Sequence, residues 1–593
     1  MPRIPHGAAI PLSQFREARE AVIRSLGELS PLAFAVARPV DLQDFDFMFR
    51  RLQSNPAFLL PEGRKTRDDL VRLGRAMRET RGDDPAGDSR IPAVFTYLGQ
   101  FIDHDITLET VSAELNQLLD PGLKPLSLQE IQEKIRNART ATLDLDSLYN
   151  APAPRVGPKM TLGQNTRLNG TAPPTLRPPG KDDDNDLPRE PRSKDIAHDR
   201  AALIGDPRND ENTIVSQLHT AFLRAHNALV GRGLNFAEAR RQLTQHYQYI
   251  ILNEFLPSIA DPQIVNQILR YGNKFYLPTP ARYYMPLEFA VAAYRFGHSM
   301  VRSNYDFNLN FNTSGAPGTF PASLQLLFTF TALSGQLGDF DTLPDNWIIQ
   351  WENFVGAGRP VQWARRIDTK LVEPLFELRD LEGNPIQPPD GGRLAVRNLL
   401  RGYRLRMPTG QAVARVVGVP ALTPAELTAV AAAVPPAPGE ESQLAVMRDS
   451  VFLRRTPLWY YVLAEGAARG GGNRLGPVGS TIVAEVLIGL IRRGRDSILS
   501  QGTNWRPTLP SERPGRFTLA DLLRLAGVLR GASWSRSGGG ATKKGGAAQK
   551  SAGKSAKRSA PAKGAAKGAA KKSAEKSARK SAKKSAKKSS RKG

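Results

Sequence analysis

Residues 97–109, YLGQFIDHDITLE, gather several side chains that could do acid–base chemistry. On an α-helix Gln100 and His104 lie four residues apart and share a face, Asp103 lies beside them, and Asp105 projects about 100° away from His104. A histidine on such a helix is more often a core residue than a catalyst. The neighbouring acids favour a catalytic role for His104, but this segment alone does not identify a function.

A second group of polar residues stands at 205–212, GDPRNDEN, directly before an apolar helix pattern. Arg208 and Glu211 are three residues apart and would point into one cavity if the helix begins near Asn209. The alternative is an ordinary helix N-terminus, in which the polar residues cap the helix and the acids occupy its first turn.

Two further segments carry a polar residue in an apolar setting. In residues 288–305, EFAVAAYRFGHSMVRSNY, His298 follows Gly297, a residue small enough to let a large flat group approach the backbone. In residues 397–408, RNLLRGYRLRMP, Asn398 stands in another predicted helix. Neither segment is diagnostic alone.

Taken together, these four segments resemble the animal haem peroxidase family, which includes myeloperoxidase, peroxidasin and peroxinectin-like proteins with many bacterial relatives, and more distantly the cyclooxygenases. The resemblance covers residues 91–409, with the motifs in the same order and at similar separations. It implies binding of haem b, reaction with hydrogen peroxide through an oxyferryl intermediate, and oxidation of small phenols or halides, in keeping with a response to oxidative stress.

The resemblance also implies roles for individual residues on the distal side of the haem. His104 matches the distal histidine, which takes a proton from peroxide and returns it to the departing oxygen. Arg208 matches the distal arginine, whose charge stabilises the breaking O–O bond. Gln100 matches the glutamine that orders pocket water and halide.

On the proximal side, His298 matches the iron ligand and Asn398 its hydrogen-bond partner, which accepts the other ring N–H. Arg295 matches an arginine near a haem propionate. Asp103 and Glu211 match carboxylates that form ester bonds to haem in mammalian members, and could do so here. A third link, through a methionine sulfonium, is excluded because Asn212 occupies that position.

The resemblance further implies a structural Ca²⁺ site. Its ligands would be Asp105 together with Thr140, the carbonyl of Thr142, Asp144 and Asp146 in the loop TATLDLDSLYN. Alternating oxygen donors in a short loop suit a hard cation. The alternative is an exposed acidic turn.

Two comparisons within the superfamily favour a peroxidase. Fatty-acid dioxygenases and cyclooxygenases have a radical tyrosine three residues before the proximal histidine, where this chain has Arg295; Tyr294 is one residue out of helical phase. Those oxygenases also lack the distal arginine. The alternatives are a fatty-acid dioxygenase and a catalytically weak haem module held on nucleic acid. His219 and His226 are expected to be core histidines.

Helical periodicity dominates the chain and strand-like alternation is scarce, so the predicted fold class is mainly α. We expect an N-terminal extension over 1–90, a haem peroxidase domain over 91–535 and a disordered tail over 536–593. Helices are predicted at residues 15–27, 64–80, 213–230, 236–255, 261–271, 287–302, 422–435, 480–493 and 518–530, with a loop at 81–92 and a long irregular excursion at 151–199.

The composition of this 593-residue chain separates a globular body from a basic tail. Residues 538–593 hold 19 of the 82 Lys and Arg residues against one acid, Glu575, in repeats such as SAKK and GAAK, so this segment is expected to attract DNA, RNA or another polyanion without reading sequence. The alternative is a solubility tail with no dedicated partner.

The complete absence of cysteine excludes disulfides, thiolate metal sites and a Cys-ligated haem. No secretory signal is recognised, and the longest apolar stretch, residues 480–491, is too short to span a bilayer. A bacterial or otherwise intracellular, cytoplasmic setting is therefore expected; leaderless secretion is the alternative.

Overall fold

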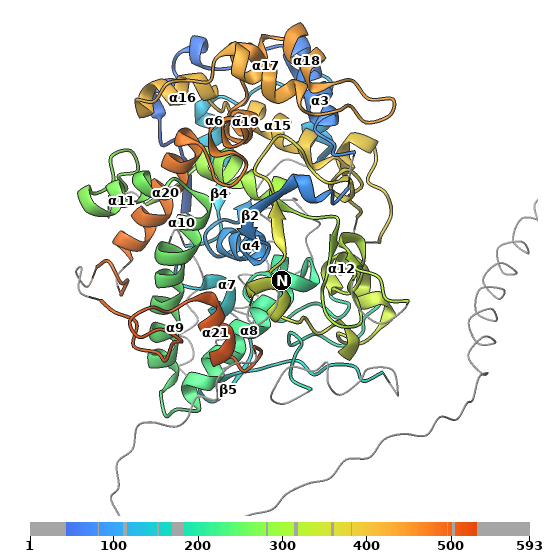
Figure 1. Ribbon diagram of the computed structural model, residues 1–593, viewed down its shortest axis with the longest axis vertical. Helices are drawn as coiled ribbons and strands as arrows, with labels where there is room; N and C mark the ends of the chain where they lie inside the picture. The colour runs from blue at the N-terminus through green and yellow to red at the C-terminus, as the bar shows by residue number, and fades with distance from the viewer. Residues whose placement is uncertain are drawn as a thin grey trace, which may run out of the picture. The chain divides into compact units, whose positions relative to one another are not determined.

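The computed structural model describes residues 43–529 except 81, 111–114, 141, 151–152, 169–182, 280–282, 314–317, 357–360, 381, 495 and 501–504. The fold is mainly α-helical, as predicted (Figure 1). The described residues all belong to one unit, 1–533. The helix predicted at 15–27 and the basic tail lie outside the described residues.

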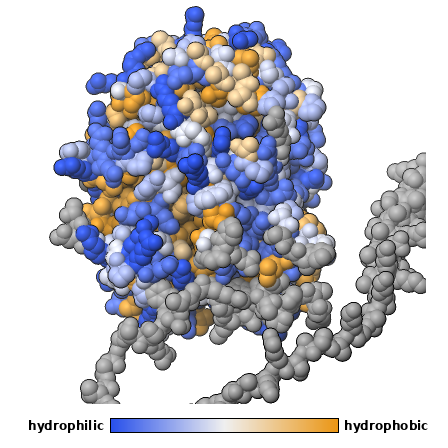
Figure 2. All heavy atoms as spheres, in the orientation of Figure 1, coloured by the Kyte–Doolittle hydropathy of each residue, from blue (hydrophilic) through white to orange (hydrophobic). Residues whose placement is uncertain are grey.

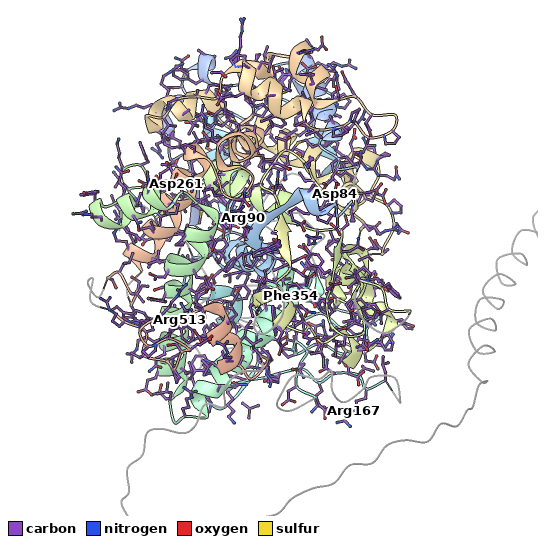
Figure 3. The ribbon with its side chains drawn as sticks, viewed as in Figure 1. Asp84, Arg90, Arg167, Asp261, Phe354 and Arg513 are labelled. Atoms are coloured by element: carbon purple, nitrogen blue, oxygen red, sulfur yellow. The ribbon has the colours of Figure 1, made fainter. Side chains whose placement is uncertain are left out.

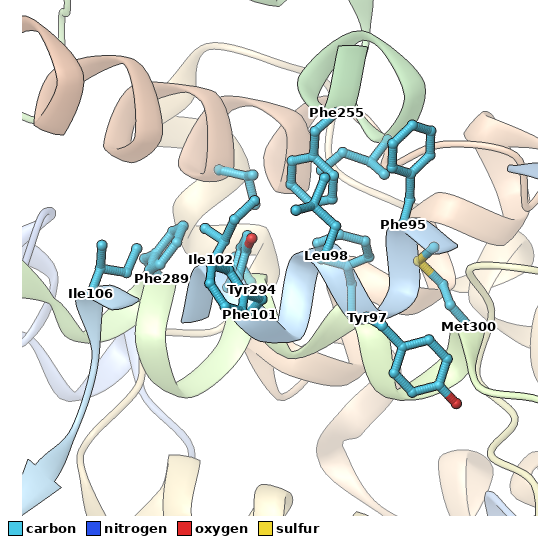
Figure 4. Close-up of a cluster of buried hydrophobic side chains, with 14 of the residues drawn as sticks. Phe95, Tyr97, Leu98, Phe101, Ile102, Ile106, Phe255, Phe289, Tyr294 and Met300 are labelled. Carbon is cyan, nitrogen blue, oxygen red and sulfur yellow. The ribbon is translucent and has the colours of Figure 1, made fainter. Parts of the chain in front are cut away.

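Helix α4 (Val94–Ile106) forms because its apolar residues recur at three- and four-residue intervals. Leu98, Phe101 and Ile102 are buried on one face, and Figure 4 shows them packed with Phe255 and Phe289 from other segments. Burial of this face leaves the polar face of α4, with Gln100, Asp103 and His104, turned toward a cavity.

Helix α8 (Thr213–Val230) is buried along most of its length and packs against α4. Its bounds are those predicted from the sequence, 213–230. Residues 207–210 form the short 3₁₀ helix η5 (Pro207–Asp210), and the side chain of Asn212 caps α8 by accepting the N–H of Val215. No helix start near Asn209 is therefore needed for Arg208 and Glu211 to reach one cavity, because Pro207 and the acceptor Asp206 stabilise a separate tight turn before α8.

The segment that carries His298 is helical but not α-helical. Residues 288–292 form a π-helix, η7 (Glu288–Ala292), and residues 293–300 form a 3₁₀ helix, η8 (Ala293–Met300). Ala292, with φ −127° and ψ −74°, breaks the hydrogen-bond register between them. The α-helical phase assumed for residues 287–302 is therefore wrong.

Short strands hold both walls of the cavity in place. The sheet order β3-β4-β1-β7 joins β3 (Glu109–Thr110), just after α4, to β7 (Tyr284–Pro286), just before η7, through β4 (Arg136–Asn137) and β1 (Gln43–Asp46). The backbone N–H groups of Met48 and Phe49 donate to the buried carboxylate of Glu288 at the start of η7. Strand β2 (Asp88–Pro92), before α4, pairs with β10 (Trp363–Arg365).

The remaining helices surround this centre. Helix α15 (Leu394–Arg404) carries Asn398, and α19 (Leu458–Gly470) and α20 (Pro477–Arg493) are buried core helices. The predicted helices elsewhere are confirmed with shifted ends: α3 (Arg64–Ala76), α9 (Phe236–Ile250) continuing as the π-helix η6 (Ile251–Phe255), α11 (Pro262–Tyr271), α17 (Pro424–Ala432) and α21 (Leu519–Leu525). The loop predicted at 81–92 is wrong in part, since it contains β2.

Most apolar side chains are buried in the core, and most charged side chains lie at the surface. Arg167 and Arg513 are exposed and Phe354 is fully buried, and Figure 3 labels all three. The face in Figure 2 is largely hydrophilic, interrupted by smaller hydrophobic patches. Within the described residues, none of the helices is both long and apolar enough to cross a membrane.

Candidate active site

A cavity lies between α4 and η5 on one side and η8 and α15 on the other. Its volume, counted as the space open to the centre of a water molecule, is about 170 Å³. On the same measure a single water needs roughly 10–15 Å³, so the cavity can hold a ligand much larger than water. Seven of the residues predicted to bind or act on a ligand line it: Gln100, Asp103, His104, Arg208, Glu211, Arg295 and His298. The structure therefore brings His104 and His298, 194 positions apart in the sequence, to one cavity.

Arg208 is held in the cavity wall by a carboxylate that the sequence did not single out. Asp206 accepts from Nε and Nη2 of Arg208 at 3.0 and 2.7 Å, and from Nε of Arg139 at 3.0 Å. Burial acts the other way, but Arg139 and Arg208 hold the pKa of Asp206 far below its ordinary value. Asp206 is thus a permanent anion that fixes the direction of Arg208.

His104 is buried and reaches a second layer of side chains. Its Nδ1 lies 2.8 Å from Oδ1 of Asn209, and Nδ2 of Asn209 lies 2.9 Å from Nδ1 of His219. Burial, together with the charge of Arg208, lowers the pKa of the His104 ring. The ring is thereby kept neutral, the state in which it can accept a proton.

The other polar residues of this wall are fixed by neighbours. Nε2 of Gln100 donates to Glu211 at 3.1 Å, and Asn212 donates to Oε1 of Gln100 at 3.0 Å. The hydroxyl of Thr107 donates to Asp103 at 2.9 Å. Asn212 thus both caps α8 and orients Gln100, while Asp103 and Glu211 each present a carboxylate to the cavity.

Opposite this wall, Asn398 contacts His298 as expected, but through its amide nitrogen and not through its amide oxygen. Nη1 of Arg295 donates to Oδ1 of Asn398 at 3.0 Å, and Nδ2 of Asn398 lies 2.9 Å from Nδ1 of His298. A guanidinium can only donate, so Arg295 holds the amide oxygen away from the ring. The amide therefore donates to His298 rather than accepting from it.

The cavity has open space beside Gly297, and arginines lie in its wall next to acidic side chains. A Cβ built on Gly297 would meet nothing within 4 Å, and Gly297 does not need a left-handed backbone. Burial, with the nearby Arg401, lowers the pKa of Arg295 and of Arg397 to about 10, and Nη1 of Arg397 is buried without a hydrogen-bond partner among the described residues. Arg401 also lines the cavity and pairs with Glu109. These residues fit a haem, with its flat ring and its propionates.

The residues predicted to bind calcium converge behind α4. Backbone N–H groups of Leu145 and Ser147 donate to Asp105, and the hydroxyl of Thr140 donates to Asp144 at 3.0 Å and Asp146 at 2.5 Å. The side chain of Thr142 donates to Thr140 at 3.2 Å. Among the described residues, however, no three or more His, Cys, Asp or Glu side chains are arranged as a metal site.

Both histidines predicted to belong to the core are fully buried. Nε2 of His226 donates to the carbonyl of Pro158, and Nδ1 of His226 lies 2.9 Å from the hydroxyl of Tyr149. His219 lies behind His104, with Asn209 between the two rings. Sequence reasoning missed Asp206, Asn209 and Arg139. The only sequence signal was for Asp206, because a buried arginine needs an acid and Asp206 stands two residues before Arg208.

Residues 124–335 match the sequence model of a family described as animal haem peroxidase. This range contains Arg208 and His298 and is narrower than the resemblance over 91–409. A peroxidase-like protein of Margaritifera margaritifera is 30% identical over 408 residues, covering 58% of this chain and 46% of that protein. Mouse (Mus musculus) myeloperoxidase is 25% identical over 314 residues, covering 43% and 41%. The chain spans about half the length, or less, of these curated relatives.

Two solved structures are similar to the described fold. Peroxidase A from Dictyostelium discoideum aligns with a TM-score of 0.49 and 17% identity, covering 78% of this chain and 89% of that one. A fatty acid alpha-dioxygenase from Arabidopsis thaliana aligns with a TM-score of 0.47 and 13% identity, covering 79% and 74%. The chain is therefore similar to the animal haem peroxidase family, through the family match over residues 124–335 and through its relatives among known sequences.

Proposed function

We propose that the protein is a haem-dependent peroxidase that reduces hydrogen peroxide and oxidises small phenolic or halide donors. The observation that carries this proposal is the placement of His104 and Arg208 on one wall of the cavity and His298 on another. A neutral base beside a fixed cation suits cleavage of a peroxide bond, and an imidazole from another wall suits iron ligation.

His298 would hold the haem iron, with Gly297 giving the ring room and Arg295 and Arg401 facing its carboxylates. Ligation through Nε2 requires that Nδ1 of His298 carry the ring proton. Asn398 can accept that N–H only when its amide oxygen leaves Arg295. Arg295 would release this oxygen on pairing with a haem carboxylate, and Asn398 would then favour the His298 tautomer that can bind iron.

When bound, the haem supplies the iron at which the O–O bond of peroxide is broken. His104 would accept a proton from peroxide and return it to the oxygen that leaves as water. Arg208, fixed by Asp206, stabilises the negative charge that develops on the departing oxygen. Gln100, oriented by Asn212 and Glu211, positions water or a halide beside these groups.

The test is the absorption spectrum of the haem-loaded protein before and after one equivalent of hydrogen peroxide. A Soret band that shifts on addition is expected. His104→Ala should retain haem but react roughly 10²–10⁴-fold more slowly, since it removes a general base. The matched control is His198→Ala, because that side chain is about half exposed and bonds Glu190. A Soret band indifferent to peroxide, or equal rates in the two variants, would overturn the proposal.

Ester bonds between haem and Asp103 or Glu211 belong to the same proposal. Both carboxylates line the cavity, and an ester would leave the haem attached to the chain after denaturation. Extraction of haem into acidified organic solvent, compared between wild type and Glu211→Gln, measures this directly.

We also propose a Ca²⁺ ion bound by Asp105, Thr140, the carbonyl of Thr142, Asp144 and Asp146. Burial and the neighbouring Asp144 raise the pKa of Asp105 well above its ordinary value, and burial and Asp146 raise the pKa of Asp144 to about 8. Carboxylates that raise one another's pKa repel one another, and a divalent cation bound beside them would relieve that repulsion. This supports a cation site over an exposed acidic turn.

A second candidate function is oxygenation of a fatty acid, favoured by one observation. Tyr294 lines the cavity and its hydroxyl has no hydrogen-bond partner among the described residues. The 3₁₀ helix η8 places Tyr294 in the cavity wall, whereas an α-helix would have left it one residue out of phase. Arg208 still favours the peroxidase. Oxygen consumption with palmitate and no added peroxide distinguishes the two, because only a dioxygenase takes up oxygen under these conditions.

A further inference from the structure

A buried chain of three side chains runs from the cavity into the core: His104, Asn209 and His219. The two contacts are 2.8 Å, from Nδ1 of His104 to Oδ1 of Asn209, and 2.9 Å, from Nδ2 of Asn209 to Nδ1 of His219. Asn209 and His219 are fully buried, and His104 is nearly so. Only His104 of the three lines the cavity.

The chemistry of the amide decides which ring atoms carry hydrogen. An amide oxygen only accepts, so Nδ1 of His104 must carry the proton that it donates to Asn209. An amide nitrogen only donates, so Nδ1 of His219 must accept. Each histidine is thereby assigned a single tautomer, and the two tautomers are opposite.

This assignment leaves Nε2 of His104 as the ring nitrogen with a free electron pair in the wall of the cavity. In the opposite tautomer Nε2 would carry a hydrogen and could not take a proton from peroxide. His219 ends the chain: its ring packs edge-on against Phe101, and its Nε2 has no hydrogen-bond partner among the described residues. The chain therefore orients His104 and does not conduct protons onward.

We infer that Asn209 is a positioning residue that, backed by His219, holds His104 in the Nδ1-protonated tautomer and so makes it competent as the base for peroxide. This inference rests on the proposed function for its catalytic meaning, but the tautomer itself is a property of the chain. Asp206 holds Arg208, the cation of the site, and Asn209 holds His104, its base.

The direct test is ¹⁵N solid-state NMR of the full chain labelled in its seven histidines, at a pH where the ring of His104 is neutral. The His104 signals are assigned by their loss in His104→Gln. We expect a protonated Nδ1 and an unprotonated Nε2 for His104, and the reverse for His219. A protonated Nε2 on His104 in the wild-type chain would overturn the inference, with or without haem present.

Variants then connect the tautomer to the reaction. Asn209→Leu removes both hydrogen bonds at similar volume and should give a mixture of His104 tautomers and slow the reaction of the haem-loaded protein with peroxide roughly 10–100-fold, the usual effect of losing such a partner. Asn209→Asp keeps an acceptor for His104 and should restore the Nδ1-protonated signal and most of the rate. If Asn209→Leu fails to fold, His219→Phe, which removes only the backing contact, replaces it.

The matched control is Asn308→Leu, which removes another buried amide, one that donates to backbone carbonyls of Asn346 and Ile348 outside the cavity wall. It should change neither the His104 signals nor the rate. An Asn209→Leu protein with wild-type tautomer and rate contradicts the inference. A wild-type chain with the expected tautomer but no reaction with peroxide supports the positioning and refutes the proposed function instead.

Discussion

At the scale of single residues, the distal wall depends on the charge of Asp206. This fully buried carboxylate is shared between Arg139 and Arg208. Removing one partner of a buried ion pair leaves an uncompensated charge in a medium that solvates it poorly. Asp206, which fixes the direction of Arg208, is therefore also a structural residue.

Asp206→Asn is expected to destabilise the protein by about 3–5 kcal/mol, because two guanidinium groups lose their common counter-ion. Urea denaturation of the full chain measures this. Asp341→Asn is the matched control: it also removes an acid from an arginine pair, but its side chain is 73% exposed, so a change of less than about 1 kcal/mol is expected. Equal effects of the two substitutions would show that Arg208 does not depend on Asp206.

Gly297 tests the fit of a planar group to the cavity. Gly297→Val places a branched side chain where the structure has open space and requires no left-handed backbone. The thermal stability of the haem-free protein should therefore remain near that of wild type, while haem affinity falls at least about tenfold, or about 1.4 kcal/mol. Haem titration followed by absorbance measures the affinity. Undiminished haem binding would place the ring elsewhere.

At the scale of elements, the loop at 140–147 is joined to α4 through Asp105, the neighbour of His104. The backbone of Leu145 and Ser147 donates to Asp105, so the loop and the C-terminal turn of α4 form one local unit. A cation in that unit would stabilise the helix that presents His104.

Removal of calcium is therefore expected to lower Tm. A ligand present at a hundred times its Kd contributes about 2.7 kcal/mol to stability, and scanning calorimetry with and without a chelator detects a loss of this size. Asp105→Asn should start from a lower Tm and no longer respond to the chelator. A wild-type Tm that is insensitive to chelation, with metal analysis showing no bound calcium, would contradict the site.

At the scale of the whole molecule, charge is divided very unevenly along the chain. Of the formal net charge of +25, residues 538–593 contribute +18, and the other 537 residues only +7. A body with so small a net charge has little long-range attraction for polyanions. We propose that the tail places the protein on nucleic acid and takes no part in the peroxide reaction.

Deletion of residues 538–593 should leave the rate with peroxide unchanged and abolish retention on DNA at moderate salt. Retention of the full chain should weaken steeply as salt rises, since binding through phosphates releases counter-ions. Titration of labelled duplex of unrelated sequences, at several salt concentrations, provides the measurement. If the shortened chain binds DNA equally well, the body and not the tail carries the interaction.

The amino-acid sequence by itself determined the mainly α-helical fold, the helices with regular apolar spacing, such as α4 and α8, and seven of the residues that meet at the cavity. These features depend on local periodicity and on motifs of a few residues, which a sequence displays directly. It also excluded thiolate chemistry, because the chain has no cysteine.

The tertiary structure alone decided how these residues are held. Arg139 reaches Asp206 across 67 positions, and Asn398 turns its amide nitrogen to His298 because Arg295 takes the oxygen. The break at Ala292 moves Tyr294 into the cavity wall, and Asn209 joins His104 to His219. Tertiary packing decides the hydrogen-bond partners, the ring tautomers and the local departures from α-helical geometry. The spacing of residues within one segment does not show which other segments pack against it.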